Sequence, residues 1–470
     1  MKWLKNGVVG LSVFILTGCA IYQPRPLLTA PRLTPSVAAL NTHVDGSGLA
    51  ELPASWRKHP ITVSDGLDET ETVLLAVLNS PQLAAARTQM LEAKAMLYNA
   101  GLLPDPQLSP SLDYPYHSGP GLIFSETYAI GINLRQILTR GARRDVATEH
   151  AKATYLNVRW QEWQIIQQAR MLWRRAFIQQ QQLGVLHDQF EQAKTTWNSE
   201  RTALLKGNST LDKEGLSLAP LMNAQAAIKQ TRRQLNMTMH GLHLLLGLDP
   251  AVPLKLTWSK DMIPLIRPPL QGEQLKTLLH QISEHRPDLL ALQAGYKSQD
   301  RKVRLEILDQ YPSFNIGLNN ARDTGGVWTL GPFVTMNLPI LNGNRGQVAM
   351  ARATRTRLRK VYRYQLTSAY VQASQMARDQ KLALAEWHTL RMHLPHLKMI
   401  VKRMQQAFTA GDINMLTFTS LRSAYFAQQI RVLGLEQALL EQTVALDTLT
   451  GVLLSDKAAS SAPVSAVPSH

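Results

Sequence analysis

The sequence predicts a mainly helical protein that also supplies strands to a membrane β-barrel, arranged as two copies of one unit. Residues 327–341 alternate between apolar and polar side chains, as in a strand with one apolar face, and the alternation ends at Gly343. The same layout occurs about 200 residues earlier and ends at Gly141, and so long a period indicates an internal repeat. Residues 142–206 contain no proline and almost no glycine, which predicts one very long helix.

The chain of 470 residues carries a formal net charge of +16. Such a balance raises nucleic acid or an anionic membrane as partners, but we find no nucleic-acid-binding module and expect no nucleic acid. The basic residues are dispersed along the helical segments, with a denser run after Gly343. A solvated helix face explains this run, and contact with anionic lipid headgroups or an anionic lumen are the alternatives. The run consists of Arg352, Arg355, Arg357, Arg359, Lys360 and Arg363.

Residues 1–18 are predicted to be a lipoprotein signal peptide. Lys2 and Lys5 precede an apolar run over residues 7–16, which is too short to span a bilayer. The run ends in Leu16-Thr17-Gly18-Cys19, which resembles the bacterial lipobox, whose cysteine becomes the lipid-modified first residue of the mature protein. Cys19 is the only cysteine, so it has no partner for an internal disulfide. Ala20 follows it in place of an aspartate, which points to the outer membrane; an incidental cysteine at an ordinary cleavage site is the alternative.

The first unit follows a proline-rich strap over residues 19–66, where regular structure is not expected. We assign residues 67–260 to the first repeat. Two helices in series are expected from Glu69 to Gly101, because Pro81 suits the first turn of a second helix. Strands over 105–115 and 124–138 follow, then a helix over 142–206, a tip near 207 and a returning helix to Leu248.

The second repeat, residues 261–455, has the same order. Helical sequence is interrupted at Arg286-Pro287-Asp288, and strands are predicted over 313–321 and 327–341. A long helix, a tip near 411 and a returning helix complete the repeat, and residues 456–470 form a low-complexity tail that we expect to be disordered. Pro332 and Pro339 each remove a donor from the strand ladder, so we expect them where the strand bends or its pairing lapses.

Four strands of this kind form two hairpins and cannot close a barrel alone. Lipid supplies no hydrogen bonds to an open strand edge, and single-chain barrels start at about eight strands. Several copies of the chain are therefore expected to pool their strands, with the polar long helices standing in water.

In these features the sequence resembles the TolC-like outer-membrane factor family, the exit ducts of tripartite efflux pumps and of type I secretion. The resemblance covers nearly the whole chain after the signal peptide, in the right order. It rests on the lipobox at Leu16–Cys19, Asn79-Ser80-Pro81-Gln82-Leu83, its echo Arg286-Pro287-Asp288-Leu289, Leu103-Pro104, Tyr311-Pro312, Leu330-Gly331-Pro332, residues Leu338 to Gly346, and the tip glycines Gly207 and Gly411.

The resemblance implies a homotrimer with a twelve-stranded barrel and a twelve-helix periplasmic tunnel. It implies a lipid-anchored outer-membrane channel that serves as the passive exit duct of an efflux system of the RND type, docked on a periplasmic adaptor and an inner-membrane pump. A type I secretion duct is the alternative within the family. A lipidated periplasmic adaptor, with one helical hairpin flanked by β-rich domains, and a periplasmic enzyme with coiled-coil arms are the alternatives from other classes.

In relatives, the hairpin tips meet the adaptor, and acidic residues beyond the second tip narrow the aperture. By position, the docking candidates are Gly207, Asn208, Ser209, Gly411, Asp412 and Ile413. The aperture positions hold Thr417 and Ser420, so an acidic ring is not expected, and Arg403 and Arg422 are further candidates for closure.

No catalytic arrangement stands out in the sequence, and we predict that the protein is not an enzyme. Histidines occur at helical spacing, but no cysteine or carboxylate completes a ligand set, so we predict no metal site and no cofactor besides the covalent lipid, palmitate, on Cys19. The histidines are His240 and His243, and separately His388, His393 and His396.

Overall fold

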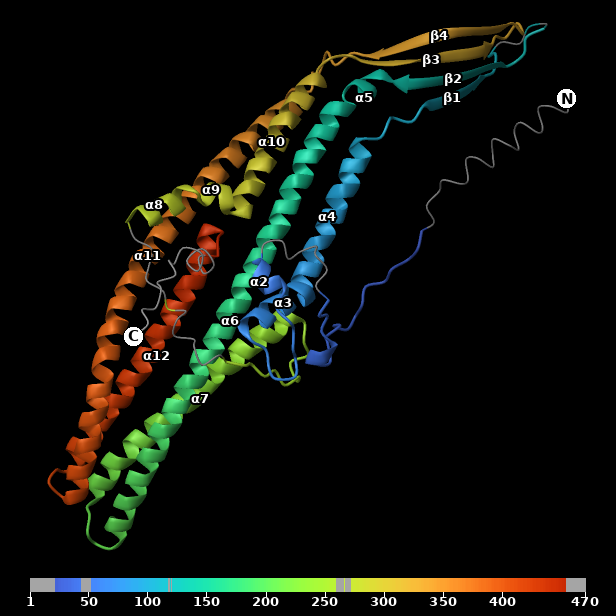
Figure 1. Cartoon of the computed structure of the whole chain (residues 1–470). Coiled ribbons are helices and arrows are strands. Elements are labelled where there is room, and N and C mark those ends of the chain that lie inside the picture. Colours follow the sequence, from blue (N-terminus) through green and yellow to red (C-terminus); the bar gives the residue numbers. More distant parts are fainter. Residues whose placement is uncertain are drawn as a thin grey trace.

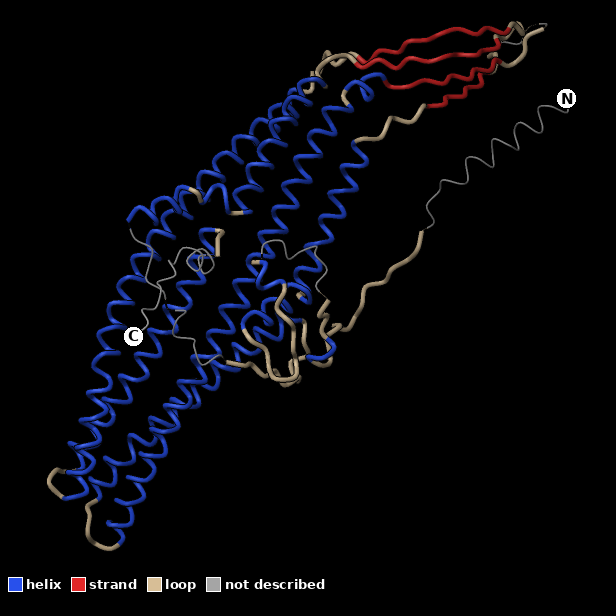
Figure 2. The backbone as a smooth tube through the Cα atoms, viewed as in Figure 1, coloured by secondary structure: helices blue, strands red, loops and turns tan. Residues whose placement is uncertain are grey.

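The computed structural model describes residues 22–43, 52–116, 119, 121–258, 266 and 272–453. The predicted signal peptide, Cys19 and the tail over 456–470 lie outside these residues. The described chain is a long helical body with one small sheet at one end and two helical hairpin tips at the other (Figure 1). Helices make up most of the backbone, and the strands are confined to the end opposite the hairpin tips (Figure 2).

Helices of the first repeat follow the local signals in the sequence. The helix α3 begins where Asp68 accepts a hydrogen bond from the Glu71 backbone while the Glu71 side chain accepts one from the Asp68 backbone, a capping box. Pro81 occupies the first turn of α4. The bounds are α3 Glu69–Asn79, α4 Pro81–Ala100, α5 Leu134–Leu138, α6 Arg140–Leu205 and α7 Leu211–Leu246.

The second repeat has matching long helices of the same length as those of the first. Both α6 and α11 contain 66 residues, and both α7 and α12 contain 36. The bounds are α8 Gly272–His280, α9 Ile282–His285, α10 Pro287–Leu308, α11 Arg345–Ala410 and α12 Met415–Thr450. No helix in the described ranges is both long enough and apolar enough to cross a lipid bilayer.

The strap before α3 lies against the segment that links the repeats. It contains the short helices η1 Val37–Ala39 and α2 Ala54–Arg57. Isolated bridges pair Thr34 with Leu248 and Leu67 with Leu256. Apolar side chains of α3, including Leu74 and Leu75, pack there against α6 and the end of α7 in the largest buried cluster. This cluster fixes the middle of the rod, which we call the equator.

The helices form a layer that is open at both sides. Near the sheet the order is α4, α6, α10 and α11, and near the tips it is α7, α6, α12 and α11. One edge of this layer is therefore formed by α4 and α7, and the other by α11.

The four strands form one antiparallel sheet in the order β1, β2, β3, β4. Its inner pair, β2 and β3, joins the two repeats, and β1 and β4 are edges. The bounds are β1 Gln107–Asp113, β2 Ser125–Asn133, β3 Ser313–Arg322 and β4 Trp328–Asn337.

Two strand predictions were wrong in detail. The strand predicted over 124–138 ends at Asn133, because the Asn133 side chain accepts a hydrogen bond from the backbone of Gln136 and starts α5. The strand predicted over 327–341 ends at Asn337, before Pro339. Pro332, however, lies inside an unbroken register opposite Leu318, so the expected lapse in pairing is absent there. Within one chain β4 is an edge strand, where a proline is tolerated.

Candidate functional site

The sheet has two chemically different faces. One row across the four strands places Leu108, Ile130, Leu318 and Pro332 on the same face, and the three non-proline side chains are exposed. The neighbouring row on the opposite face begins at Gln107, with Gly131 and Gly317 next to it. The exposed apolar face fits lipid, whereas the other face consists mostly of small and polar side chains.

At the opposite end, both hairpin tips use the same turn. Gly207 and Gly411 have φ of 74° and 85°, the left-handed region that glycine adopts without strain. The amide of Asn208 donates to the carbonyl of Ala203, and that of Asp412 donates to the carbonyl of Ala407. These bonds end α6 and α11 in the same Schellman-type cap.

The docking candidates predicted on the two tips lie beside one hollow. Asn208 and Ser209 line it from the first tip, and Met415 and Leu416 line it from the second; its volume is about 450 Å³. Ser209 donates to Glu200, which closes the first turn. Gly411, Asp412 and Ile413 form the adjoining turn of the second tip, outside the residues that line the hollow. Exposed Leu416 makes this end of the molecule partly apolar.

The aperture candidates divide into exposed residues and one interhelical residue. Thr417, Ser420 and Arg403 are exposed on their helices. Arg422 is partly buried, donates a hydrogen bond of 2.9 Å to Thr196 on α6, and lies over the Phe418 ring. Burial lowers the pKa of the Arg422 guanidinium. The structure thus makes Arg422 a link between α12 and α6.

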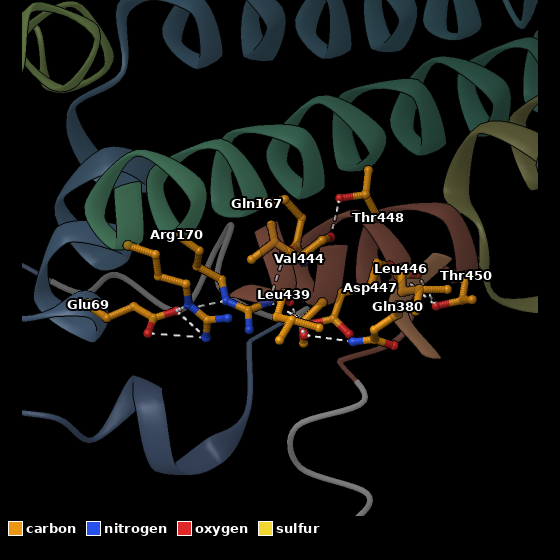
Figure 3. A network of polar contacts seen from close by, with 12 residues as sticks. Glu69, Gln167, Arg170, Gln380, Leu439, Val444, Leu446, Asp447, Thr448 and Thr450 are labelled. Carbon is orange, nitrogen blue, oxygen red and sulfur yellow. Dashed lines mark hydrogen bonds and ion pairs between the residues drawn. The ribbon is translucent and has the colours of Figure 1, made fainter. Parts of the chain in front are cut away.

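A buried ionic network at the equator was missed in the sequence. The guanidinium of Arg170 on α6 is fully buried and donates to Glu69 on α3 at 3.1 Å and to Asp447 on α12 at 2.7 Å. Arg174, one turn along α6, lies 2.8 Å from Glu69. Figure 3 shows Glu69, Arg170 and Asp447 converging from three helices. The network joins α3 and α6 of the first repeat to α12 of the second.

Charge balance explains how this network tolerates burial. Burial raises the pKa of the Glu69 carboxyl, but the charges of Arg174 and Arg170 outweigh it, so the pKa lies below its ordinary value. Burial lowers the pKa of Arg170, and its two carboxylate partners more than restore it. Glu69 and Arg170 therefore stay ionised near neutral pH. The only signal in the sequence was the presence of arginines one turn apart within a helix that must be partly buried.

A second buried pair stands at the interruption predicted at Arg286-Pro287-Asp288. Arg286 binds Asp288 through two hydrogen bonds of 2.9 and 2.7 Å and donates to the Leu449 carbonyl on α12. Its guanidinium lies 4.8 Å from the centre of the Trp160 ring on α6. The break between α9 and α10 is therefore also a junction of three helices.

The histidine pair His240 and His243 shows contacts of an ordinary structural kind. The rings of His240 and His243 lie 6.2 Å apart, but both nitrogens of His243 face backbone carbonyls, those of Met239 and Val252. Within the described ranges, no group of three or more histidine, cysteine or acidic side chains is placed to hold a metal ion.

Comparisons with known proteins find the same architecture. Residues 278–452 match the model of the outer membrane efflux protein family. The solved structure of CusC superposes with a TM-score of 0.68 at 17% identity, covering 92% of this chain and 99% of that one. The chain has the TolC-like fold. A search of curated proteins finds no significant match.

Other TolC-like channels agree to a similar degree. The CmeC outer membrane channel of Campylobacter jejuni has a TM-score of 0.68 at 15% identity, over 93% of this chain and 96% of that one. The outer membrane protein VceC of Vibrio cholerae has a TM-score of 0.66 at 13% identity, over 82% and 96%. The fold expected from the sequence is therefore confirmed.

Proposed function

We propose that the chain is the outer-membrane exit duct of a tripartite efflux system of the RND type. The observation that carries this proposal is the pair of open edges: a single sheet ends at β1 and β4, and a single layer of helices ends at α4, α7 and α11. A sheet with one lipid-facing side needs closure, because lipid offers its edges no hydrogen bonds. Three copies close twelve strands into a barrel and twelve helices into a tunnel.

Two features favour this function over the alternatives. An adaptor was expected to have one helical hairpin flanked by β-rich domains, whereas the described chain has two hairpins and one sheet. Among the structurally similar proteins, CusC is described as forming a transmembrane channel and CmeC as an outer membrane channel. We propose that the duct is passive and not an enzyme, with energy supplied by an inner-membrane pump.

The assembly is tested by fractionation and mass measurement. Full-length protein is expected in the outer-membrane fraction, and native mass spectrometry of the detergent-solubilised protein is expected to give a trimer. Recovery in soluble periplasmic extract, or as a stable monomer in detergent, contradicts the proposal.

Deletion of the gene, followed by a panel of metals, drugs and dyes, then identifies the exported solute and separates efflux from protein secretion.

We also propose that Cys19 carries the lipid anchor. Radiolabelled palmitate is expected to enter the wild-type protein and to be absent from Cys19→Ala. Labelling that survives this substitution overturns the anchor without affecting the fold.

We propose that the hollow between the tips receives the periplasmic adaptor. Leu416 is 56% exposed beside this hollow, whereas Leu382, 70% exposed, lies in the middle of α11. Leu416→Arg is expected to abolish efflux in cells while leaving the trimer intact, with Leu382→Arg as the matched control. Normal efflux by Leu416→Arg contradicts docking at this place.

A further inference from the structure

The junction between β4 and α11 places exposed cations directly after exposed apolar side chains. Ile340 and Leu341, in the turn after β4, are 76% and 94% exposed. Arg345 begins α11, and Arg352 and Arg359 follow at seven-residue steps, so the three lie on one face of the helix. All three arginines are exposed.

These arginines differ from their neighbour Arg355. Arg355 forms an ion pair of 2.8 Å with Asp300 on α10 and so joins two helices. In the described ranges, no ion pair or side-chain hydrogen bond holds the guanidinium groups of Arg345, Arg352 and Arg359. Their charge is therefore not neutralised by an ion pair within the part of the chain that the structure describes.

The first repeat has the same order at its own junction. Leu138, at the end of α5, is 74% exposed, and exposed Arg144 follows near the start of α6. Both junctions lie at the end of the helices next to the sheet (Figure 1). By contrast, Arg135 donates a hydrogen bond to the backbone carbonyl of Tyr311, and Arg143 donates one to that of Gln136. These two arginines therefore bind backbone at the ends of helices and strands.

An apolar surface followed by free cations matches the boundary between the core of a bilayer and its headgroups. Guanidinium groups bind phosphate oxygens through paired hydrogen bonds. The attraction of a basic residue to an anionic leaflet fades within about 10 Å of the surface. Along α11, Arg352 lies about 10 Å beyond Arg345 and Arg359 about 20 Å beyond it, so the three should contribute unequally.

We propose that Arg345 and Arg352, with Arg144 in the first repeat, bind the phosphate groups of an anionic phospholipid in the leaflet next to the helices. The proposal rests on the outer-membrane placement given under Proposed function. Conducting solutes does not require these arginines to bind lipid. The proposal therefore gives the start of the basic run a role beyond the proposed function.

The test uses the full-length protein in detergent and phosphatidylglycerol as the probe, with phosphatidylcholine of the same acyl chains as the control lipid. Native mass spectrometry is expected to show preferential binding of phosphatidylglycerol, weakened by salt. Arg345→Gln is expected to reduce its affinity about fivefold, Arg352→Gln less, and Arg359→Gln least.

Lys381 provides the matched control. It is exposed on the same face of α11, about ten turns and ~54 Å beyond Arg345, and Lys381→Gln is expected to leave binding unchanged. Equal binding of the two lipids, or an equal loss in Lys381→Gln, overturns the proposal. Complete competition by millimolar inorganic phosphate also overturns it, because the site then recognises free phosphate rather than a lipid. If Arg345→Gln changes the anion selectivity of the channel and not lipid binding, the arginine lines the lumen and the proposal is wrong.

The same spectra report the number of subunits. A trimer without preference for phosphatidylglycerol contradicts only this inference, whereas a monomer contradicts the proposed function itself.

Discussion

The contact between α6 and α12 is held differently at its two ends. At the equator, Arg170 binds Asp447 at 2.7 Å in a fully buried pair, and Arg175 binds Glu441 at 2.7 Å. Toward the tips, α12 is linked to α6 by the hydrogen bond from Arg422 to Thr196. The two repeats are thus joined by ion pairs at the equator and by a hydrogen bond to a neutral acceptor near the tips.

The difference indicates where the duct can move. Removing one member of a buried ion pair leaves a charge without compensation, so the equatorial contact resists separation. A hydrogen bond between a partly exposed guanidinium and a hydroxyl contributes much less, about 1 kcal/mol or less after solvent screening. We therefore expect the hairpins to shift at the tips while the equator stays fixed.

The largest effect is expected from Asp447→Asn, which leaves the buried Arg170 charge only partly neutralised. It should lower the free energy of unfolding by about 3–5 kcal/mol. Glu441→Gln is the control, because its pair with Arg175 is partly exposed and should contribute about 1 kcal/mol or less. Denaturant titrations that give equal losses contradict the distinction between the buried and the exposed pair.

The second expectation concerns acid. Because the pKa of Glu69 is lower in the native protein than in the unfolded chain, the native state binds fewer protons and is favoured at high pH. This contribution is complete above the unfolded pKa of Glu69 and is lost as the pH falls through its native pKa. Melting temperatures between pH 7 and pH 3 should fall less steeply in Glu69→Gln than in the wild type; parallel curves contradict the role of Glu69.

A smaller effect is expected from two glycine substitutions of opposite sign. Gly411 has a φ of 85°, so Gly411→Ala should strain the tip by about 1 kcal/mol. Gly434 lies within α12, and the space that an added methyl group would occupy there is open, so Gly434→Ala should stabilise the helix by about 0.5–1 kcal/mol. Thermal unfolding checks both signs, and stabilisation by Gly411→Ala contradicts the assigned turn.

The smallest effect on global stability is expected from Arg422→Ala. Hydrogen exchange should rise at residues 190–205 and 415–425, near the tips, and stay unchanged around Arg170 and Asp447. An equal rise at the equator contradicts the division between a fixed end and a movable end.

The sequence predicted the features that depend on local chemistry. Alternation located the strands, Pro81 marked a helix start, Arg286-Pro287-Asp288 marked a helix break, and the tip glycines marked the reversals. It did not predict contacts between distant residues, since nothing local to Arg170 identifies Asp447, 277 residues away, as its partner. The early end of β2 also escaped prediction, because apolar residues continue past Asn133 while its side chain caps a helix.

The most direct test of the duct is single-channel recording of purified full-length protein in planar lipid bilayers. The wild type and Arg422→Ala are recorded together, so that a closed resting state is not mistaken for the absence of a pore. We predict discrete conductance steps from inserted trimers, with larger or more frequent openings in Arg422→Ala. If trimers of both the wild type and Arg422→Ala insert into the bilayer and neither conducts, the proposal that this chain forms a channel is contradicted.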